Sequence, residues 1–154
     1  MIQLNTFWDC KDYNDLDTDE LYAIMNLRQE VFVVEQNCPY NDADGKDKKS
    51  YHVMGYNSKS ELVAYARIVK PGVSYKEVSI GRVVSKKSVR KTGIGIELMH
   101  EALKQINEFY SEVPVRISAQ SWLLKFYKKF GFVSIGNEYL EDHIPHTEML
   151  KTEW

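Results

Sequence analysis

Hydrophobic and polar positions along the chain predict three helices. Apolar residues recur at helical spacing from Leu21 to Phe32, which indicates a helix that begins at an N-cap on Thr18 and ends near Gln36. A second helix is expected from Gly93 to Tyr110, where the apolar stripe consists of Leu98, Met99, Ala102, Leu103, Ile106, Phe109 and Tyr110. A short third helix is expected over Trp122–Phe130, with Ser121 as its cap and Gly131 at its end.

Short runs rich in β-branched and aromatic residues predict the strands. These runs are Ile2–Trp8, Tyr51–Tyr56, Glu61–Val69, Val78–Ser85, Val113–Ala119, Phe132–Ile135 and Thr147–Lys151. Asn57–Ser60 predicts the turn of a hairpin, and the polar segments 9–19, 37–50 and 138–146 are expected as turns and loops. The order of these elements favours a mixed sheet with helices on its faces.

Composition places the chain among ordinary globular proteins, with a single domain expected over residues 1–154. The net charge of −2 argues against general nucleic-acid binding, and no apolar run approaches the roughly 18 residues that cross a membrane. The N-terminus lacks the basic and apolar regions of a signal peptide. Cys10 and Cys38 form neither a disulfide framework nor a CxxC zinc motif, so no metal and a cytoplasmic location are expected.

A basic, glycine-containing turn connects the strand Val78–Ser85 to the helix that follows it. This turn, Arg90–Gly95, points backbone N–H groups at one spot where the helix dipole favours an anion, and glycine permits a phosphate to approach the backbone closely. Positively charged side chains near the turn strengthen the prediction of an anion site: Arg82, Lys86, Lys87, Arg90 and Lys91. The turn matches neither the P-loop nor the dinucleotide fingerprint. A helix N-terminus that merely contains glycines remains the alternative.

The first third of the chain is acidic. Residues 1–47 contain eleven Asp or Glu against three Lys or Arg. A solvated acidic face accounts for this bias, and so does a site that attracts a cationic substrate.

Several motifs together resemble the GNAT (GCN5-related N-acetyltransferase) superfamily and, within it, the ElaA-like subgroup. The turn has the R-x-x-G-x-G pattern of the acyl-CoA pyrophosphate loop, and FYKKFGF (126–132) follows at the expected distance. Further matches are LRQEVFVVEQNCPY (27–40), Asp44, GRVV (81–84) and IPHTEM (144–149). Two positions depart from the pattern, because Lys91 and His143 stand where glycine is usual.

The resemblance implies the GNAT acyl-CoA N-acyltransferase fold, an α/β (α+β mixed sheet) architecture. Its central mixed sheet is splayed between the fourth and fifth strands and has helices on both faces. It also implies acetyl-CoA as the acetyl donor and direct attack by a primary amine, of a small molecule or a protein, in a ternary complex. The expected donor-binding residues are Val83, Val84, Arg90, Lys91, Thr92, Gly93, Ile94 and Gly95. The two valine side chains are also suited to packing in the core. Lys86 and Lys87 could contact the 3′-phosphate of CoA or simply belong to a solvated turn.

The resemblance places Tyr127 as the acid that protonates the departing thiolate, although by position alone it could equally be a packing aromatic. Candidate bases are Glu35, His52, Glu77 and His146, of which Glu35 and His146 rank first. The amine could instead lose its proton through a water molecule.

Two other functions stay open at this stage. A non-catalytic acyl-CoA-binding module would keep the glycine turn, and a cysteine hydrolase would use Cys38 with His52 or His146. For the transferase we expect a cationic amine acceptor and neither nucleic acid nor membrane as a partner. A homodimer is open by analogy with the family.

Overall fold

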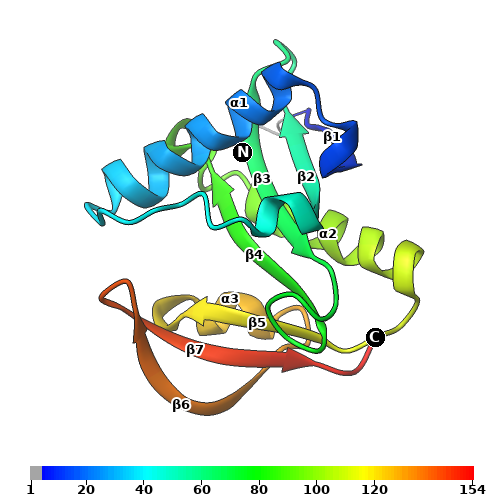
Figure 1. The fold of residues 1–154 in the computed structure, drawn as a ribbon, viewed down its shortest axis with the longest axis vertical. Helices are drawn as coiled ribbons and strands as arrows, with labels where there is room; N and C mark the ends of the chain where they lie inside the picture. The colour runs from blue at the N-terminus through cyan, green and yellow to red at the C-terminus, as the bar shows by residue number, and fades with distance from the viewer. Residues whose placement is uncertain (1–4) are drawn as a thin grey trace.

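Seven strands form one sheet in the computed structural model, which describes residues 5–154 (Figure 1). The strands are β1 (Phe7–Asp12), β2 (Ser50–Tyr56), β3 (Leu62–Val69), β4 (Val78–Ser85), β5 (Val115–Gln120), β6 (Val133–Glu141) and β7 (Ile144–Lys151). Their order across the sheet is β1-β2-β3-β4-β5-β7-β6. Neighbouring strands are antiparallel except β4 and β5, which are parallel, so the predicted mixed sheet is confirmed.

The sheet divides between β4 and β5. These strands pair only at Val78 with Val115 and at Ser79 with Arg116, after which they diverge (Figure 1). The predicted splay between the fourth and fifth strands is therefore confirmed. Such a split leaves the inner edges of both strands without a neighbouring strand, and this is where a substrate can enter a sheet.

The helices are α1 (Thr18–Arg28), α2 (Ile94–Tyr110) and α3 (Leu124–Lys128). Two apolar clusters show that helices cover both faces of the sheet. On one face α1 packs over Met54, Tyr65 and Val84. On the other face α2 packs over β2, β3 and β4, and it buries most of its predicted stripe, namely Leu98, Met99, Ala102, Leu103 and Ile106.

The first helix differs from the prediction at both ends. Its N-cap is Asp17 rather than Thr18, because the Asp17 and Glu20 side chains each accept a hydrogen bond from the other residue's backbone N–H. The helical path does reach Glu35, but it is π-helical over Gln29–Glu35. A π-helical stretch is rare and frequently occurs at a functional site.

The hairpin of β2 and β3 forms as predicted, whereas the bounds of both edge strands were predicted wrongly. The first strand is Phe7–Asp12 rather than Ile2–Trp8, so it includes residues expected to form a turn; residues 2–4 of the prediction lie outside the described part of the chain. Asp9 and Lys11 are compatible with a strand here because β1 has a partner on one side only.

Residues 138–146 were expected to be a loop, but β6 continues to Glu141 and β7 begins at Ile144. The polar sequence misled the prediction because β6 is the other edge strand and is largely exposed. Asp142 and His143 form the turn, and both have a positive φ, as a tight two-residue hairpin requires. Within residues 5–154, every helix is too short or too polar to cross a membrane.

Candidate active site

A cavity of about 250 Å³ lies where β4 and β5 separate. One wall comes from the π-helical segment, the loop that follows it, and strands β3 and β4. The other wall comes from β5, α3 and the β6–β7 hairpin. Residues from the first half of the chain that line it include Phe32, Gln36, Cys38, Tyr40, Asp44, Lys46, Arg67, Arg82 and Val83. Those from the second half include Ser118, Gln120, Tyr127, Glu141, Asp142 and His146.

A bulge turns β4 beside this cavity. Val84 pairs with Tyr65, and Gly81 pairs with Arg67, so two residues of β4 stand opposite one residue of β3. Arg82, at the bulge, has a positive φ of 47°. A bulge frees backbone groups from the ladder, which is what binding a substrate carbonyl requires. Of the two valines expected to bind the acyl donor, Val83 lines the cavity and Val84 is buried against α1.

The glycine turn presents unused backbone donors. Gly93 is the N-cap of α2 with φ 87°, and no side chain caps the helix. Within residues 5–154, no hydrogen bond uses the backbone N–H groups of Gly93, Ile94 or Gly95. A Cβ on Gly93 would meet no atom within 4 Å, so the space beside the turn is open. Free amides at a helix N-terminus, next to open space, suit the pyrophosphate of an acyl-CoA.

Arg90 and Glu35 form an ion pair with each other. The Arg90 guanidinium lies 2.8 Å from a Glu35 carboxylate oxygen, and it also donates to the carbonyl of Ser85. The pair fastens the glycine turn to the end of the π-helical segment. Neither residue lines the cavity. Thr92 is similarly occupied, because its hydroxyl donates to the carbonyl of Val89 within the turn.

Tyr127 lies on α3, and its hydroxyl faces the cavity. The ring packs edge-on against Phe126 and Phe132, and burial raises the pKa of the phenol well above its usual value. Within residues 5–154, no hydrogen bond uses the Tyr127 hydroxyl, yet this oxygen is not among the buried polar atoms without a partner. It is therefore open to the cavity, and it stays protonated at neutral pH.

His146 lines the same wall of the cavity, on β7. Its Nδ1 lies 2.7 Å from the carbonyl oxygen of Ile144, which can only accept, so Nδ1 carries the proton. Nε2 then points toward the carboxylate of Glu141, 3.3 Å away. The ring also stacks against Tyr139. Both ring nitrogens are thus oriented, as a group that exchanges a proton at one fixed position requires.

The remaining candidate bases have structural partners. His52 is fully buried between the hydroxyl of Tyr65 and the carbonyl of Asp47, and burial lowers the pKa of its imidazole. Glu77 is held by two nitrogens of Arg116. Neither lines the cavity. Cys38 does line it, and its thiol donates to the backbone carbonyl of Asp142, which joins the two walls.

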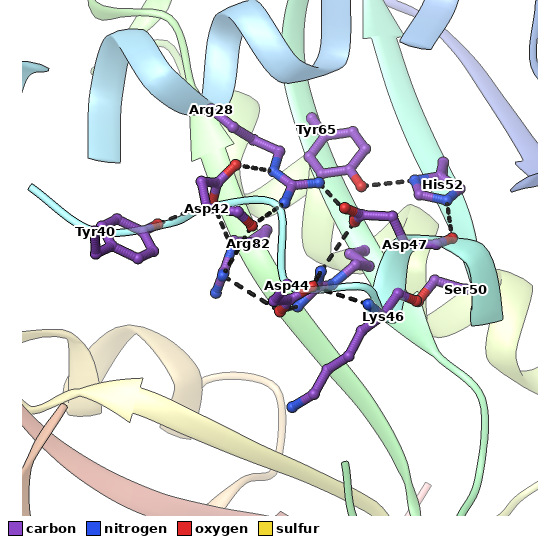
Figure 2. Close-up of polar contacts among 11 residues, drawn as sticks. Arg28, Tyr40, Asp42, Asp44, Lys46, Asp47, Ser50, His52, Tyr65 and Arg82 are labelled. Carbon is purple, nitrogen blue, oxygen red and sulfur yellow. Dashed lines mark hydrogen bonds and ion pairs between the residues drawn. The ribbon is translucent and has the colours of Figure 1, made fainter. Parts of the chain in front are cut away.

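A buried network of arginines and aspartates, which sequence reasoning missed, forms one wall of the site (Figure 2). Arg28, on α1, has no exposed surface, and its guanidinium lies 2.7 Å from both the Asp42 and Asp47 carboxylates. The Asp42 carbonyl accepts a third hydrogen bond from the same side chain. Arg28 thereby attaches the loop at residues 37–49 to α1.

Two strand arginines complete this network. Arg67 donates to both carboxylate oxygens of Asp44 and also contacts Asp47, while Arg82 contacts Asp42 and Asp44. Burial by itself raises the pKa of Asp44, but the hydrogen bonds and charge of Arg67 outweigh it and lower this pKa to about 2. These three acids of the first third are therefore neutralised by arginines rather than left to attract a cation. The sequence feature that could have revealed this network is Arg67, an arginine within the apolar run of β3.

Comparisons with known proteins agree on one family. A protein-family model described as an acetyltransferase (GNAT) domain matches residues 14–153. The Escherichia coli protein ElaA is 40% identical over 146 residues, which cover 94% of this chain and 95% of ElaA.

Solved structures extend the agreement to three dimensions. The crystal structure of an acyl-CoA N-acyltransferase from Pseudomonas aeruginosa is 42% identical, with a TM-score of 0.91 over 96% of this chain and 99% of that one. The crystal structure of Escherichia coli ElaA has a TM-score of 0.89 and 39% identity, with the same coverage of both chains.

Proposed function

The chain belongs to the GNAT family of acyl-CoA N-acyltransferases, and on that premise we propose that it transfers an acetyl group from acetyl-CoA to a primary amine in the cavity between β4 and β5. The observation that carries this proposal is the free hydroxyl of Tyr127, which stands protonated at the cavity wall. Acetyl is the donor group we propose because the small cavity leaves little room for a long acyl chain beside an acceptor.

Donor binding is assigned to the glycine turn and the bulge. The amides of Gly93, Ile94 and Gly95 bind the pyrophosphate, and Lys91 adds a positive charge next to them. The backbone at Val83 receives the acetyl carbonyl where β4 bulges. Arg90 and Glu35 hold the turn in place through their ion pair, and this positioning role replaces direct phosphate contact by Arg90 and proton abstraction by Glu35.

The chemistry of the chain's own residues follows from these positions. The amine nitrogen attacks the carbonyl carbon of the donor's thioester, and the carbon–sulfur bond then breaks. Tyr127 donates its proton to the leaving sulfur. His146 takes the amine's proton at Nε2, where Glu141 stabilises the resulting positive charge.

The test is to incubate the purified protein with acetyl-CoA and a panel of primary amines, while thiol release and acetylated products are measured together. The proposal predicts that CoA thiol and acetylated amine appear in equal amounts and only when an amine is present. Butyryl-CoA in place of acetyl-CoA should react more slowly. Donor binding without any acetylated product would contradict the proposal and favour the non-catalytic acyl-CoA-binding module.

A further inference from the structure

The cavity has a cationic wall and an acidic wall. Lys46, Arg67 and Arg82 line it from the first half of the chain, together with Asp44. Glu141 and His146 line it from the β6–β7 hairpin. This separation of charge inside one cavity is unlike a uniformly acidic site for a simple cation, and it indicates what kind of amine the cavity accepts.

Lys46 supplies the unbalanced charge of the cationic wall. Arg28, Arg67 and Arg82 are matched by three aspartates, Asp42, Asp44 and Asp47 (Figure 2). Within residues 5–154, the ammonium of Lys46 has no carboxylate within 4 Å. Figure 2 shows its side chain running away from the aspartates, and Lys46 is among the residues that line the cavity.

Arg67 has hydrogen-bonding capacity left over on the same wall. Its Nη1 and Nη2 bind the carboxylate of Asp44, but Nε is the one buried side-chain nitrogen or oxygen of residues 5–154 without a partner. The side chain is almost fully buried and lines the cavity. A buried donor without a partner costs free energy, and because this nitrogen has almost no accessible surface, a ligand oxygen reaches it only when the Arg67 side chain shifts.

We propose that the acceptor is a small amine that also carries a carboxylate, as an amino acid does. Its carboxylate binds Lys46, with Arg67 beside it, and its amine points toward Glu141 and His146. A single surplus positive charge matches a monoanionic carboxylate better than a dianionic phosphate ester. This inference rests on the proposed function, because it names the substrate class of the same cavity.

The experiment compares matched acceptors in the acetyl-CoA assay. Each common amino acid is tested beside its carboxamide and its decarboxylated amine, which keep the side chain and remove the negative charge. The parent protein, Lys46→Gln and Lys48→Gln are compared. Lys48 belongs to the same short helix (Lys46–Lys49) but is exposed and does not line the cavity, so it controls for the loss of one lysine charge.

The parent should prefer at least one amino acid over its carboxamide by about 10- to 100-fold in kcat/KM, the range expected for a hydrogen bond to a charged group. Lys46→Gln should reduce this preference to near one, mainly by raising KM for the amino acid. Lys48→Gln should leave the preference intact. Because Lys46 makes no ion pair with any residue of the described part of the chain, its replacement should leave thermal unfolding unchanged.

Three results would overturn the inference. Carboxamides or decarboxylated amines that react as well as the amino acids would refute it, while the proposed transferase would stand. A strong preference that survives in Lys46→Gln would refute the role of this lysine. If the parent binds acetyl-CoA but acetylates no amine at all, the proposed function fails and this inference fails with it.

Discussion

Single residues with strained backbone cluster around the proposed site. Arg82, Lys91 and His143 all have positive φ values, at the β4 bulge, the glycine turn and the β6–β7 turn. Non-glycine residues adopt this conformation at a cost, and they persist where the surrounding structure holds them. The two positions at which the sequence departs from the family pattern, Lys91 and His143, are thus positions whose backbone suits glycine.

Replacing Lys91 or His143 by glycine should not destabilise the protein. Each change relieves about 1 kcal/mol of backbone strain, although the unfolded chain gains some freedom. We expect the free energy of unfolding to rise by about 0.5 kcal/mol per change. Denaturant unfolding measures this, and a loss above about 1 kcal/mol would contradict the account.

Changing Tyr127 to Phe isolates the proposed acid. Because no hydrogen bond within residues 5–154 uses the hydroxyl, thermal unfolding should be nearly unchanged. The rate constant kcat should fall by about 10²- to 10⁴-fold, as expected for loss of a general acid, with little change in KM for acetyl-CoA. Tyr22→Phe, at an exposed tyrosine, is the matched control. An unchanged kcat in Tyr127→Phe would remove the residue from the mechanism.

Among the elements, the loop at residues 37–49 depends on side-chain pairs rather than on regular structure. Apart from the short helix at Lys46–Lys49, it forms no helix or strand, yet Asp42 and Asp47 are buried against Arg28. This anchoring places Lys46 and Asp44 at the cavity. The loop is therefore a fixed wall of the site.

Breaking this anchor should be costly. Arg28→Met leaves two buried carboxylates with fewer partners, and loss of one member of a buried ion pair costs about 3–5 kcal/mol. Urea unfolding should show this loss in Arg28→Met and almost none in Lys48→Met, where the lysine is exposed. A loss below about 1 kcal/mol in Arg28→Met would contradict the proposed anchoring.

Sequence reasoning predicted the central elements and failed at the edges, for a physical reason. The strands β2, β3 and β4 and the stripe of α2 are buried, so their apolar patterns are strong. The edge strands β1 and β6 face water on one side and carry polar residues that resemble loops. The arginine–aspartate pairs join positions far apart in sequence, such as Asp42 and Arg82, and no local pattern encodes them.

At the scale of the whole molecule, the site exists because two halves of one sheet separate. The turn at Gly93, Tyr127 on α3 and His146 on β7 come from the second half of the chain, while Lys46 and Arg67 come from the first. Local motifs in the sequence predicted Tyr127, His146 and the glycine turn as site residues, and the first two line the cavity. It gave no indication that Glu35 and Arg90 bind each other, since their pairing depends on how the π-helical segment meets the turn.

Lowering the pH should reduce the free energy of unfolding, because Asp44 becomes protonated and loses its ion pairs. The pKa of Asp44 is lowered to about 2 in the folded protein, so its contribution to stability is present above pH 4 and is lost as the pH falls through 2. Because Asp44 is exposed and solvent screens its ion pairs, the contribution is about 1 kcal/mol. Denaturant unfolding between pH 5 and 2 should show this decline in the parent and a shallower one in Asp44→Asn. Equal slopes would contradict the assignment.

Donor binding at the glycine turn is tested by thermal unfolding with and without acetyl-CoA in the parent, Gly93→Val and Gly72→Val. Both glycines have positive φ and open space around them, but only Gly93 caps α2, so Gly72→Val controls for backbone strain. At about 100 times its Kd, the ligand should add about 2.7 kcal/mol and raise Tm by about 5–10 °C. We expect this rise in the parent and in Gly72→Val but not in Gly93→Val. No rise in a folded parent, or an equal rise in all three proteins, would contradict donor binding at this turn.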